Sequence, residues 1–220
     1  MVNISLDDVQ ADSRVNTLIE KSNHYLGVIG YTEHGFRHSR LVAEKASNIL
    51  LSLGYAAREA KLAAIAGYLH DIGNVVGRKG HCQAGALLAL DLLRDHGMAL
   101  EEVAEVVAAI GNHDEDEGQV VNRVSAALIL ADKSDVHRSR VRNPDFSTFD
   151  IHDRVNYAVE DSSLQVNEGR NITLNLKIDT DISHVVEYFE IFLSRMIMCK
   201  RSANYLEARF SLMINGAQLL

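Results

Sequence analysis

Apolar residues recur with the period of an α-helix through the first two-thirds of the chain. Between Ser5, a residue suited to cap a helix N-terminus, and the break at Gly27–Gly30, apolar positions keep close to this period. Further periodic stretches end at or near a glycine, as helices commonly do. The pattern predicts six helices. They span Ser5–Leu26, Thr32–Leu53, Ala56–Ile72, His81–His96, Leu100–Ile110 and Asn122–Arg138.

The pattern changes after Asp135, where a basic, turn-rich connection contains Pro144, the one proline of the chain. Beyond it, two alternating segments flank the turn Asn167–Arg170 as in a β-hairpin. A long apolar-rich helix and a weakly alternating stretch follow. The expected elements are a helix at Asp150–Val159, strands at Ser163–Val166 and Ile172–Ile178, a helix at Ile182–Ala208, and a third strand at Phe210–Asn215.

We therefore expect a mainly α protein. It has a helical bundle core and a small C-terminal α+β extension, in which the long helix backs an antiparallel hairpin or three-stranded sheet. The change in composition divides the chain into domains at residues 1–140 and 141–220. The chain has 220 residues, 47% of them hydrophobic, so a sizeable core is available and disordered or collagen-like classes are excluded.

The extension contains no catalytic motif. Its long helix carries more apolar residues than one packed face needs, which favours association into a homodimer. An effector- or ligand-binding subdomain and a structural cap on the helical core are the alternatives.

Charge and composition limit the class of partner. The formal charge of −8, from 22 Lys and Arg against 30 Asp and Glu, gives no uniform positive field and disfavours DNA binding. A small phosphorylated substrate can still bind where a local cation dominates. Cys82 and Cys199 have no metal or redox spacing, and neither an export segment nor a long apolar window is present. We expect a cytoplasmic protein without membrane contact.

Five of the ten histidines, His34, His38, His70, His81 and His113, lie at ends or faces of predicted helices. Residues four apart on one helix have Cβ atoms about 5–6 Å apart, so His34 and His38 can reach a shared metal ion. Each histidine taken singly is more often an ordinary surface or hydrogen-bonded residue than a ligand.

The order of these residues is more specific. His38 is followed by Ser39 and Arg40, the segment LHDIGN spans residues 69–74, and Asp132 lies within ILADKSD at residues 129–135. This order resembles the HD superfamily of metal-dependent phosphohydrolases from about His34 to Asp135. The resemblance implies that His38, His70, Asp71 and Asp132 hold one divalent cation, that His81 and His113 belong to a second, and that His34 is an extra ligand.

The resemblance also implies a reaction. Imidazole and carboxylate ligands suit Mn, Fe, Mg, Co or Zn, and one or two such ions would supply a metal-activated hydroxide that attacks a phosphomonoester or phosphodiester. Nucleotides are the leading substrate class by analogy. In this reading Asp71, Lys133 and Arg78 are the catalytic residues, and Lys79, Arg138 and Arg142 bind the substrate.

Other readings stay open. The basic residues can equally serve to keep helix ends soluble. Arg138 faces the site only if the sixth helix continues past Asp135. Cys82 is expected to pack as a small apolar residue rather than to act as a nucleophile. The whole chain can also be a signalling or interaction module in which a metal ion only holds helices together. A third alternative is a structural helical protein without metal.

The chain departs from one branch of the family. Cyclic-dinucleotide phosphodiesterases usually have lysine at the position of Asn74, a second histidine at Asp114 and a Gly-Tyr-Pro signature nearby. Cyclic di-GMP is therefore not favoured as the substrate, whereas phosphodiester hydrolysis in general stays open.

Overall fold

Two central helices, α4 (Ala57–Leu69) and α7 (Arg123–Lys133), organise the helical part of the chain. The structure is a computed structural model that describes residues 3–220, so the first two residues of the expected first domain lie outside it. Every residue from Leu62 to Leu69 and from Val124 to Ala131 is buried, as expected of helices that are apolar on all sides. A polar residue at the end of either helix therefore lies deep in the protein.

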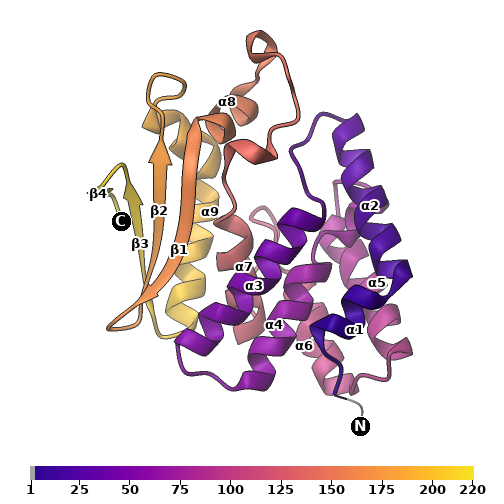
Figure 1. Cartoon of the computed structure of the whole chain (residues 1–220). Helices are drawn as coiled ribbons and strands as arrows, with labels where there is room; N and C mark the ends of the chain where they lie inside the picture. Colours follow the sequence, from indigo (N-terminus) through magenta and orange to yellow (C-terminus); the bar gives the residue numbers. More distant parts are fainter. Residues whose placement is uncertain (1–2) are drawn as a thin grey trace.

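The other helices of this part surround α4 and α7 (Figure 1). Most begin and end within a few residues of the expected positions. They are α1 (Leu6–Ala11), α2 (Ser13–Val28), α3 (Phe36–Ser52), the 3₁₀ turn η1 (Ile72–Val75), α5 (His81–Asp95) and α6 (Leu100–Gly111).

The expected first helix is two helices, α1 and α2, because of Asp12. This residue has extended backbone angles, φ −74° and ψ 116°, and its carboxylate accepts a hydrogen bond from the Arg14 backbone nitrogen at 2.8 Å. Asp12 thus ends α1 and caps α2. The apolar period continues across the break, which is why the sequence pattern did not reveal it.

The expected sixth helix was too long. Helix α7 ends at Lys133, and only a short 3₁₀ turn, η2 (Arg138–Arg140), follows. The chain turns at Asp135, whose buried carboxylate accepts hydrogen bonds from His38 and Arg37. These interactions draw Asp135 toward α3 and end the helix, so Arg138 does not continue a face of α7.

The C-terminal part is a four-stranded sheet with helices packed on it (Figure 1). The strands lie in the order β1-β2-β3-β4, and β1 pairs antiparallel with β2 as the hairpin pattern predicted. A third short 3₁₀ turn, η3 (Phe146–Thr148), precedes the helices and strands of this part. They are α8 (Ile151–Ala158), β1 (Val159–Asn167), β2 (Asn171–Ile178), α9 (Val185–Tyr205), β3 (Arg209–Ile214) and β4 (Ala217–Gln218).

The sheet is mixed, and the expectation of a purely antiparallel sheet was wrong. Strand β3 runs parallel to β2, with Ile172 opposite Phe210 and Leu174 opposite Leu212. The connection between them is α9, which returns the chain to the end of the sheet where β2 began. A helical crossover of this length is the usual connection between parallel strands.

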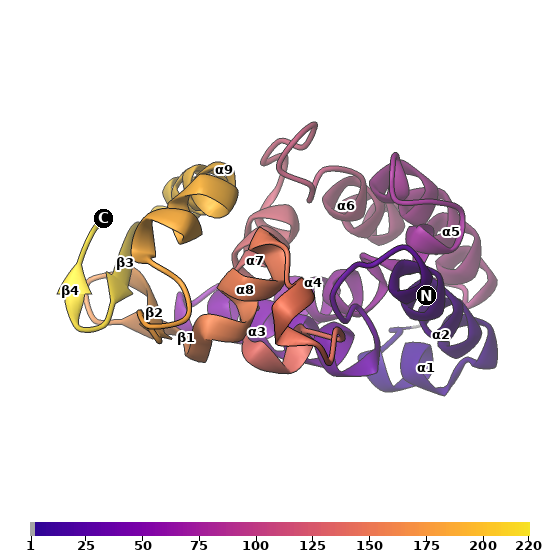
Figure 2. The same cartoon turned by 90° about the horizontal axis from the view of Figure 1, so that it is seen from above.

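The two parts share one hydrophobic core. Buried residues form a single cluster that runs from the helical part through α9 to the sheet, and α9 packs directly against α7 (Figure 2). The Arg170 guanidinium, in the β1–β2 turn, donates to the Leu53 carbonyl oxygen at 2.8 Å and to the Tyr55 hydroxyl at 3.0 Å. The division at residue 140 stays a prediction.

Helix α9 is the longest described helix. Its apolar residues lie on two faces, one buried and one exposed to solvent. Tyr188, Phe192 and Met196 are buried, whereas Val186, Leu193 and Ile197 are exposed. These exposed apolar residues do not decide whether two chains associate, so the homodimer stays a prediction. Neither α9 nor any other described helix combines the length and apolar character needed to cross a membrane.

Candidate metal centre

The candidate ligands lie at the ends of helices that pack closely together. His38 is in the first turn of α3, and His70 directly follows α4. The two helices lie close together at Gly67, where a Cβ atom would lie 2.8 Å from the Ala43 backbone nitrogen. This absence of a side chain lets α3 and α4 approach, and the approach brings His38 beside His70.

A second close approach places α5 beside the same end of α4. A Cβ atom on Gly73, in η1, would collide with the His81 carbonyl oxygen and the Gly85 nitrogen. His81, the first residue of α5, therefore lies against the segment that carries His70 and Asp71. His113 follows α6, which packs along α5.

His38, His70, Asp71 and Asp132 form a first set of ligand atoms, which we call group A. The two imidazole Nε2 atoms lie 3.2 Å apart. Asp71 Oδ2 lies 3.2 Å from His70 Nε2, and Asp132 Oδ1 lies 3.3 Å from His38 Nε2. With metal–ligand bonds of about 2.0–2.2 Å, neighbouring ligand atoms of one ion lie about 3–3.5 Å apart. These three separations of group A fall in this range, whereas those from His38 Nε2 to Asp71 Oδ2 and from His70 Nε2 to Asp132 Oδ1 are slightly longer, at 3.6 Å.

His81 and His113 form a second set, group B. Their Nε2 atoms lie 3.3 Å apart. The second carboxylate oxygen of Asp71, Oδ1, lies 3.7 Å from His81 Nε2 and 4.0 Å from His113 Nε2. Asp71 thus presents a different oxygen to each group, so its carboxylate could contribute a ligand atom to an ion held by either group.

His38, His70, His81 and His113 present Nε2 to the centre, and all five histidines interact in the same way through their second ring nitrogen. The other nitrogen, Nδ1, lies within hydrogen-bond distance of an atom that can only accept, so it must donate and Nε2 of the neutral ring carries the lone pair. The acceptors are Thr32 O for His34, Asp135 Oδ2 for His38, Gly67 O for His70, Arg78 O for His81 and Ile110 O for His113, at 2.6–3.0 Å.

The buried carboxylates and imidazoles of the centre favour binding of a cation. Burial lowers the pKa of His81 and, strongly, that of His113, so both rings are neutral. Burial would also lower the pKa of His70, but the Asp71 and Asp132 carboxylates outweigh it and raise that pKa to about 10. Asp71 Oδ2 is buried, and His70 Nε2 lies 3.2 Å from it. The neutral His81 and His113 rings beside the Asp71 carboxylate fit a divalent cation, which would take the place of the proton on His70 Nε2.

His34 lies outside the helix on which its spacing from His38 placed it. Helix α3 begins after Gly35, and His34 belongs to the extended segment before it, where its backbone nitrogen donates to Asn23 Oδ1 at 3.1 Å. Its ring centroid is nevertheless 5.5 Å from that of His38. The two histidines are neighbours, although not through helical spacing.

Asp135 orients His38 and is a residue whose role the sequence did not reveal. Its Oδ2 accepts from His38 Nδ1 at 2.6 Å and from Arg37 Nη2 at 2.7 Å. The Arg140 guanidinium lies 3.6 Å from the same oxygen. Burial opposes ionisation, but Arg140, His38 and Arg37 hold the pKa of Asp135 well below its usual range. The charged carboxylate fixes the His38 ring.

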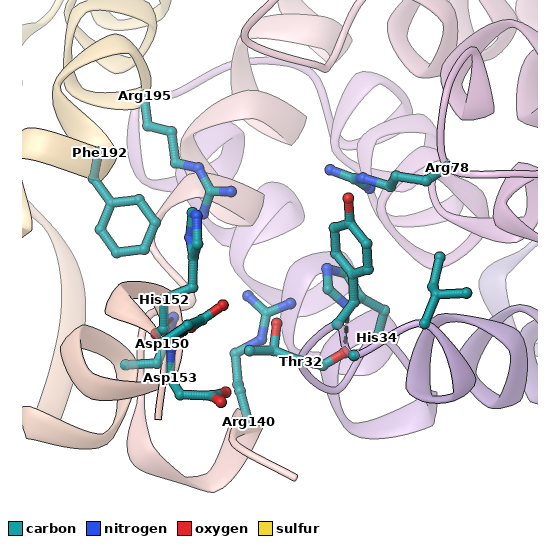
Figure 3. A pocket seen from close by; sticks show the side chains of 13 residues that line it. Thr32, His34, Arg78, Arg140, Asp150, His152, Asp153, Phe192 and Arg195 are labelled. Carbon is teal, nitrogen blue, oxygen red and sulfur yellow. Dashed lines mark hydrogen bonds between the residues drawn. The ribbon is translucent and has the colours of Figure 1, made fainter. Parts of the chain in front are cut away.

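A cavity of about 20 Å³ lies among the ligand atoms, enough to admit a water-sized species. It adjoins a cleft of about 310 Å³ between the helical part and helices α8 and α9. Arg78, Arg140 and Arg195 line both the cavity and the cleft. Figure 3 shows Arg195 beside Phe192 on one wall, Arg78 on the opposite wall near His34, and Arg140 between them.

Lys133 is less accessible than a substrate-binding lysine is expected to be. It lines the cavity, but its Nζ lies 2.9 Å from Asp132 Oδ2 and 2.5 Å from Glu115 Oε2. Burial alone would lower the pKa of Lys133, and the two carboxylates raise it above its ordinary value. Glu115 also accepts from Arg195 Nε at 2.6 Å. This network fixes Asp132 and ties α9 to the centre.

The expected substrate-binding residues are placed differently from Arg78. Lys79 is exposed and lines a neighbouring depression together with Arg78. Arg138 pairs with Glu160 at 3.3 Å, and Arg142 donates to the Thr32 carbonyl oxygen at 3.3 Å. Neither arginine lines the cleft or the cavity. The cause is the end of α7 at Lys133, after which the chain leaves the helix axis.

Sequence reasoning missed the cleft residues of the C-terminal part, among them Arg195 and His152. Arg195 left a signal, since it is a charge within the apolar run FLSRMIM of α9. His152 left none, because an exposed histidine in a short helix is ordinary. Cys82 is buried with its Sγ 3.4 Å from His81 Nε2, and burial raises the pKa of the thiol to about 12, so it is not an activated nucleophile.

Comparison with known proteins agrees with this geometry. The chain is 28% identical over 196 residues to the uncharacterized protein MJ1020 of Methanocaldococcus jannaschii, covering 78% of this chain and 74% of that protein. The family model described as HD domain matches residues 35–138, which run from the start of α3 to the end of the Asp135 turn. Residues 35–138, which contain all of these ligand candidates except His34, are therefore similar to the HD domain family.

Proposed function

We propose that the protein is a divalent-metal-dependent phosphohydrolase that cleaves a phosphomonoester or phosphodiester, with nucleotides as the leading substrate class. One observation carries the proposal. Imidazole Nε2 atoms and two aspartates from separate elements converge on one small cavity, and three arginines line both this cavity and the adjoining cleft. Cation-binding and phosphate-binding chemistry thus lie within one site.

The protein's own side chains prepare the centre for its ions. Nδ1 donation fixes each imidazole ring, and Asp71 faces both groups with its two oxygens. Without a cation, a proton on His70 Nε2 offsets the charge of Asp71 and Asp132. Divalent ions, when bound, polarise phosphoryl oxygens and activate water at neutral pH.

The arginines are suited to bind the phosphate. Arg78 Nη2 lies 3.6 Å from Asp114 Oδ2, and its guanidinium also stacks over the Tyr31 ring at 5.6 Å. Arg140 is buried and hydrogen-bonded to backbone carbonyls, and it faces the cleft from a fixed position. Guanidinium groups bind phosphate oxygens in a bidentate manner. We assign Arg78 and Arg140 to the phosphate, and Lys133 to the positioning of Asp132.

The cleft offers aromatic surface for the organic part of the substrate. Tyr31 and Phe192 both line it, and its volume of about 310 Å³ lies at the lower end of the range for small-molecule sites. Rings at these positions favour a planar group such as a nucleobase. A polymeric nucleic acid is not favoured, since the chain's net charge is −8.

A second candidate function is a non-catalytic module stabilised by metal. It is favoured by the origin of the ligands, because α3, the ends of α4, α6 and α7, and the start of α5 each contribute one. An ion would cross-link these helices whether or not it turned over a substrate.

Metal analysis and turnover distinguish the two functions. We expect protein purified without chelator to contain divalent metal and to hydrolyse chromogenic phosphomonoesters or phosphodiesters, and one or more members of a nucleotide panel. His70→Ala and Asp71→Ala should each lower turnover at least about a hundredfold. His24→Ala, an exposed histidine of α2, is the matched control and should leave turnover unchanged. A folded, metal-loaded protein without activity on the whole panel would favour the module.

A further inference from the structure

Two hollows adjoin the cavity that the candidate ligands surround. One is the cleft of about 310 Å³ described above, and the other is the neighbouring depression, whose volume is about 590 Å³. The cavity shares His34 and Arg140 with the cleft, and it shares His81 and Asp114 with the depression. A molecule centred at the cavity can therefore extend into either hollow.

The cleft and the depression meet between two arginines. Arg78 and Arg195 line the cavity, the cleft and the depression, and Figure 3 shows these two side chains on opposite walls. Tyr31 and His152 line both the cleft and the depression. From there the cleft continues toward α8 and the α2–α3 connection, and the depression continues toward the start of α5 and the α6–α7 connection. The two hollows thus lead from one point to different parts of the protein.

Each hollow can hold an organic group of its own. Both volumes fall within the range of about 300–1,000 Å³ that is usual for small-molecule sites. Ile29 and Phe192 line the cleft but not the depression, which suits the cleft to an apolar or aromatic group. Lys79 and Gln83 line the depression but not the cleft. A phosphomonoester has a single organic group and would leave one of the two hollows to water.

The charges around the cavity are mostly compensated. Each of the three arginines that line it has a carboxylate neighbour. The pairs are Arg78 with Asp114 and Arg140 with Asp135, each at 3.6 Å, and Arg195 with Glu115 at 2.6 Å. The phosphate of a monoester carries nearly two negative charges at neutral pH, whereas that of a diester carries one. Paired guanidinium groups favour the smaller charge.

We propose that the substrate is a small phosphodiester, with its phosphate at the cavity, one organic group in the cleft and the other in the depression. The inference rests on the proposed function and narrows its substrate from phosphate esters in general to diesters. Hydrolysis forms a bond between phosphorus and the oxygen of water and breaks the bond between phosphorus and one ester oxygen, which takes a proton from that water. The products are a phosphomonoester and an alcohol, one in each hollow.

Three compounds test the proposal. The p-nitrophenyl ester of thymidine 5′-monophosphate has two organic groups on its phosphate, whereas thymidine 5′-monophosphate and p-nitrophenyl phosphate each have one of them. Release of p-nitrophenolate or of inorganic phosphate measures turnover. We expect protein purified without chelator to hydrolyse the diester with a kcat/KM about tenfold or more above that of either monoester.

A variant that narrows the depression tests where the second group lies. Gln83 is exposed on α5, and a tryptophan at this position would occupy part of the depression. Gln83→Trp should therefore lower the ratio of diester to monoester kcat/KM about tenfold or more. Leu87→Trp is the matched control, because Leu87 lies one turn further along α5, is 67% exposed and lines neither hollow. It should keep the ratio.

The outcomes separate this inference from the proposed function. A diester kcat/KM less than about tenfold above that of either monoester, or an unchanged ratio in Gln83→Trp, overturns the diester assignment and leaves the phosphohydrolase standing. No hydrolysis of these compounds or of the nucleotide panel by folded, metal-loaded protein overturns both. If Gln83→Trp does not fold by circular dichroism, the comparison of the three compounds with the unaltered protein decides.

Discussion

Replacing Asp135 by asparagine tests whether the centre depends on the orientation of its histidines. Asp135 is 3% exposed and accepts hydrogen bonds from His38 Nδ1 and from both Nη atoms of Arg37. An amide of the same shape has one accepting atom and one donating NH₂ group. The NH₂ group would face a donor, either the His38 ring or a guanidinium, so one buried polar contact becomes repulsive.

The expected cost follows from these contacts. Removing one partner of a buried ion pair costs about 3–5 kcal/mol of unfolding free energy. The Arg37 side chain is 39% exposed and keeps its contact with Glu33 at 2.9 Å, so part of its charge is compensated by water and by that carboxylate. We therefore expect a loss of about 3 kcal/mol in Asp135→Asn. Metal affinity should fall roughly 10- to 100-fold, because the His38 ring is no longer fixed.

Two measurements check this prediction. Urea denaturation in the presence of a chelator gives the unfolding free energy, and zinc titration gives the affinity. Glu33→Gln is the control, because it removes the other carboxylate partner of Arg37 without touching His38, and should change stability by about 1 kcal/mol or less. A destabilised Asp135→Asn protein with unaltered zinc affinity would refute the orienting role.

Three further predictions concern packing, pH and substrate binding. Gly73→Ala should destabilise the protein by about 3 kcal/mol or more in urea denaturation, because the new Cβ collides with backbone of α5, whereas Gly77→Ala, with no atom within 4 Å, should be near neutral. Glu187 has its pKa lowered to about 2 by its arginine partner, so the stability it provides is full above pH 4.5 and lost as the pH falls toward 2. The difference in urea midpoint between the natural protein and Glu187→Gln should therefore shrink below pH 4.5; a constant difference would contradict this. Arg78→Ala, which removes an arginine assigned to the phosphate, should raise KM for a phosphate ester about tenfold or more, and Arg201→Ala, at an exposed arginine of α9, should not.

Much of the helical part was predictable because its signals are local. Glycines and capping residues mark where helices begin and end, and a fully apolar helix such as α4 can only be buried. The order of His38, the His70–Asp71 pair and Asp132 along the chain pointed to the HD superfamily before any geometry was known. These features depend on neighbouring residues and on motif order, which a single sequence contains.

Other features were not predictable because they depend on contacts between distant segments. The end of α7 is set by Asp135 meeting His38 and Arg37, nearly a hundred residues away in sequence. The parallel pairing of β3 with β2 depends on the path of α9 across the sheet. Helical periodicity alone indicates neither contact. The expected length of α7 and the expected antiparallel sheet were therefore wrong.

The sequence by itself determined most of the helices and indicated which imidazole and carboxylate residues are candidates to hold a cation, because residue type and local periodicity are properties of short segments. Only the tertiary structure decided which atoms meet. It brought the two oxygens of Asp71 toward different pairs of imidazoles and placed Arg195 of α9 at the cavity. The reason is that close packing at Gly67 and Gly73 fixes the distances between helices to a fraction of an ångström, and no periodic pattern encodes those distances.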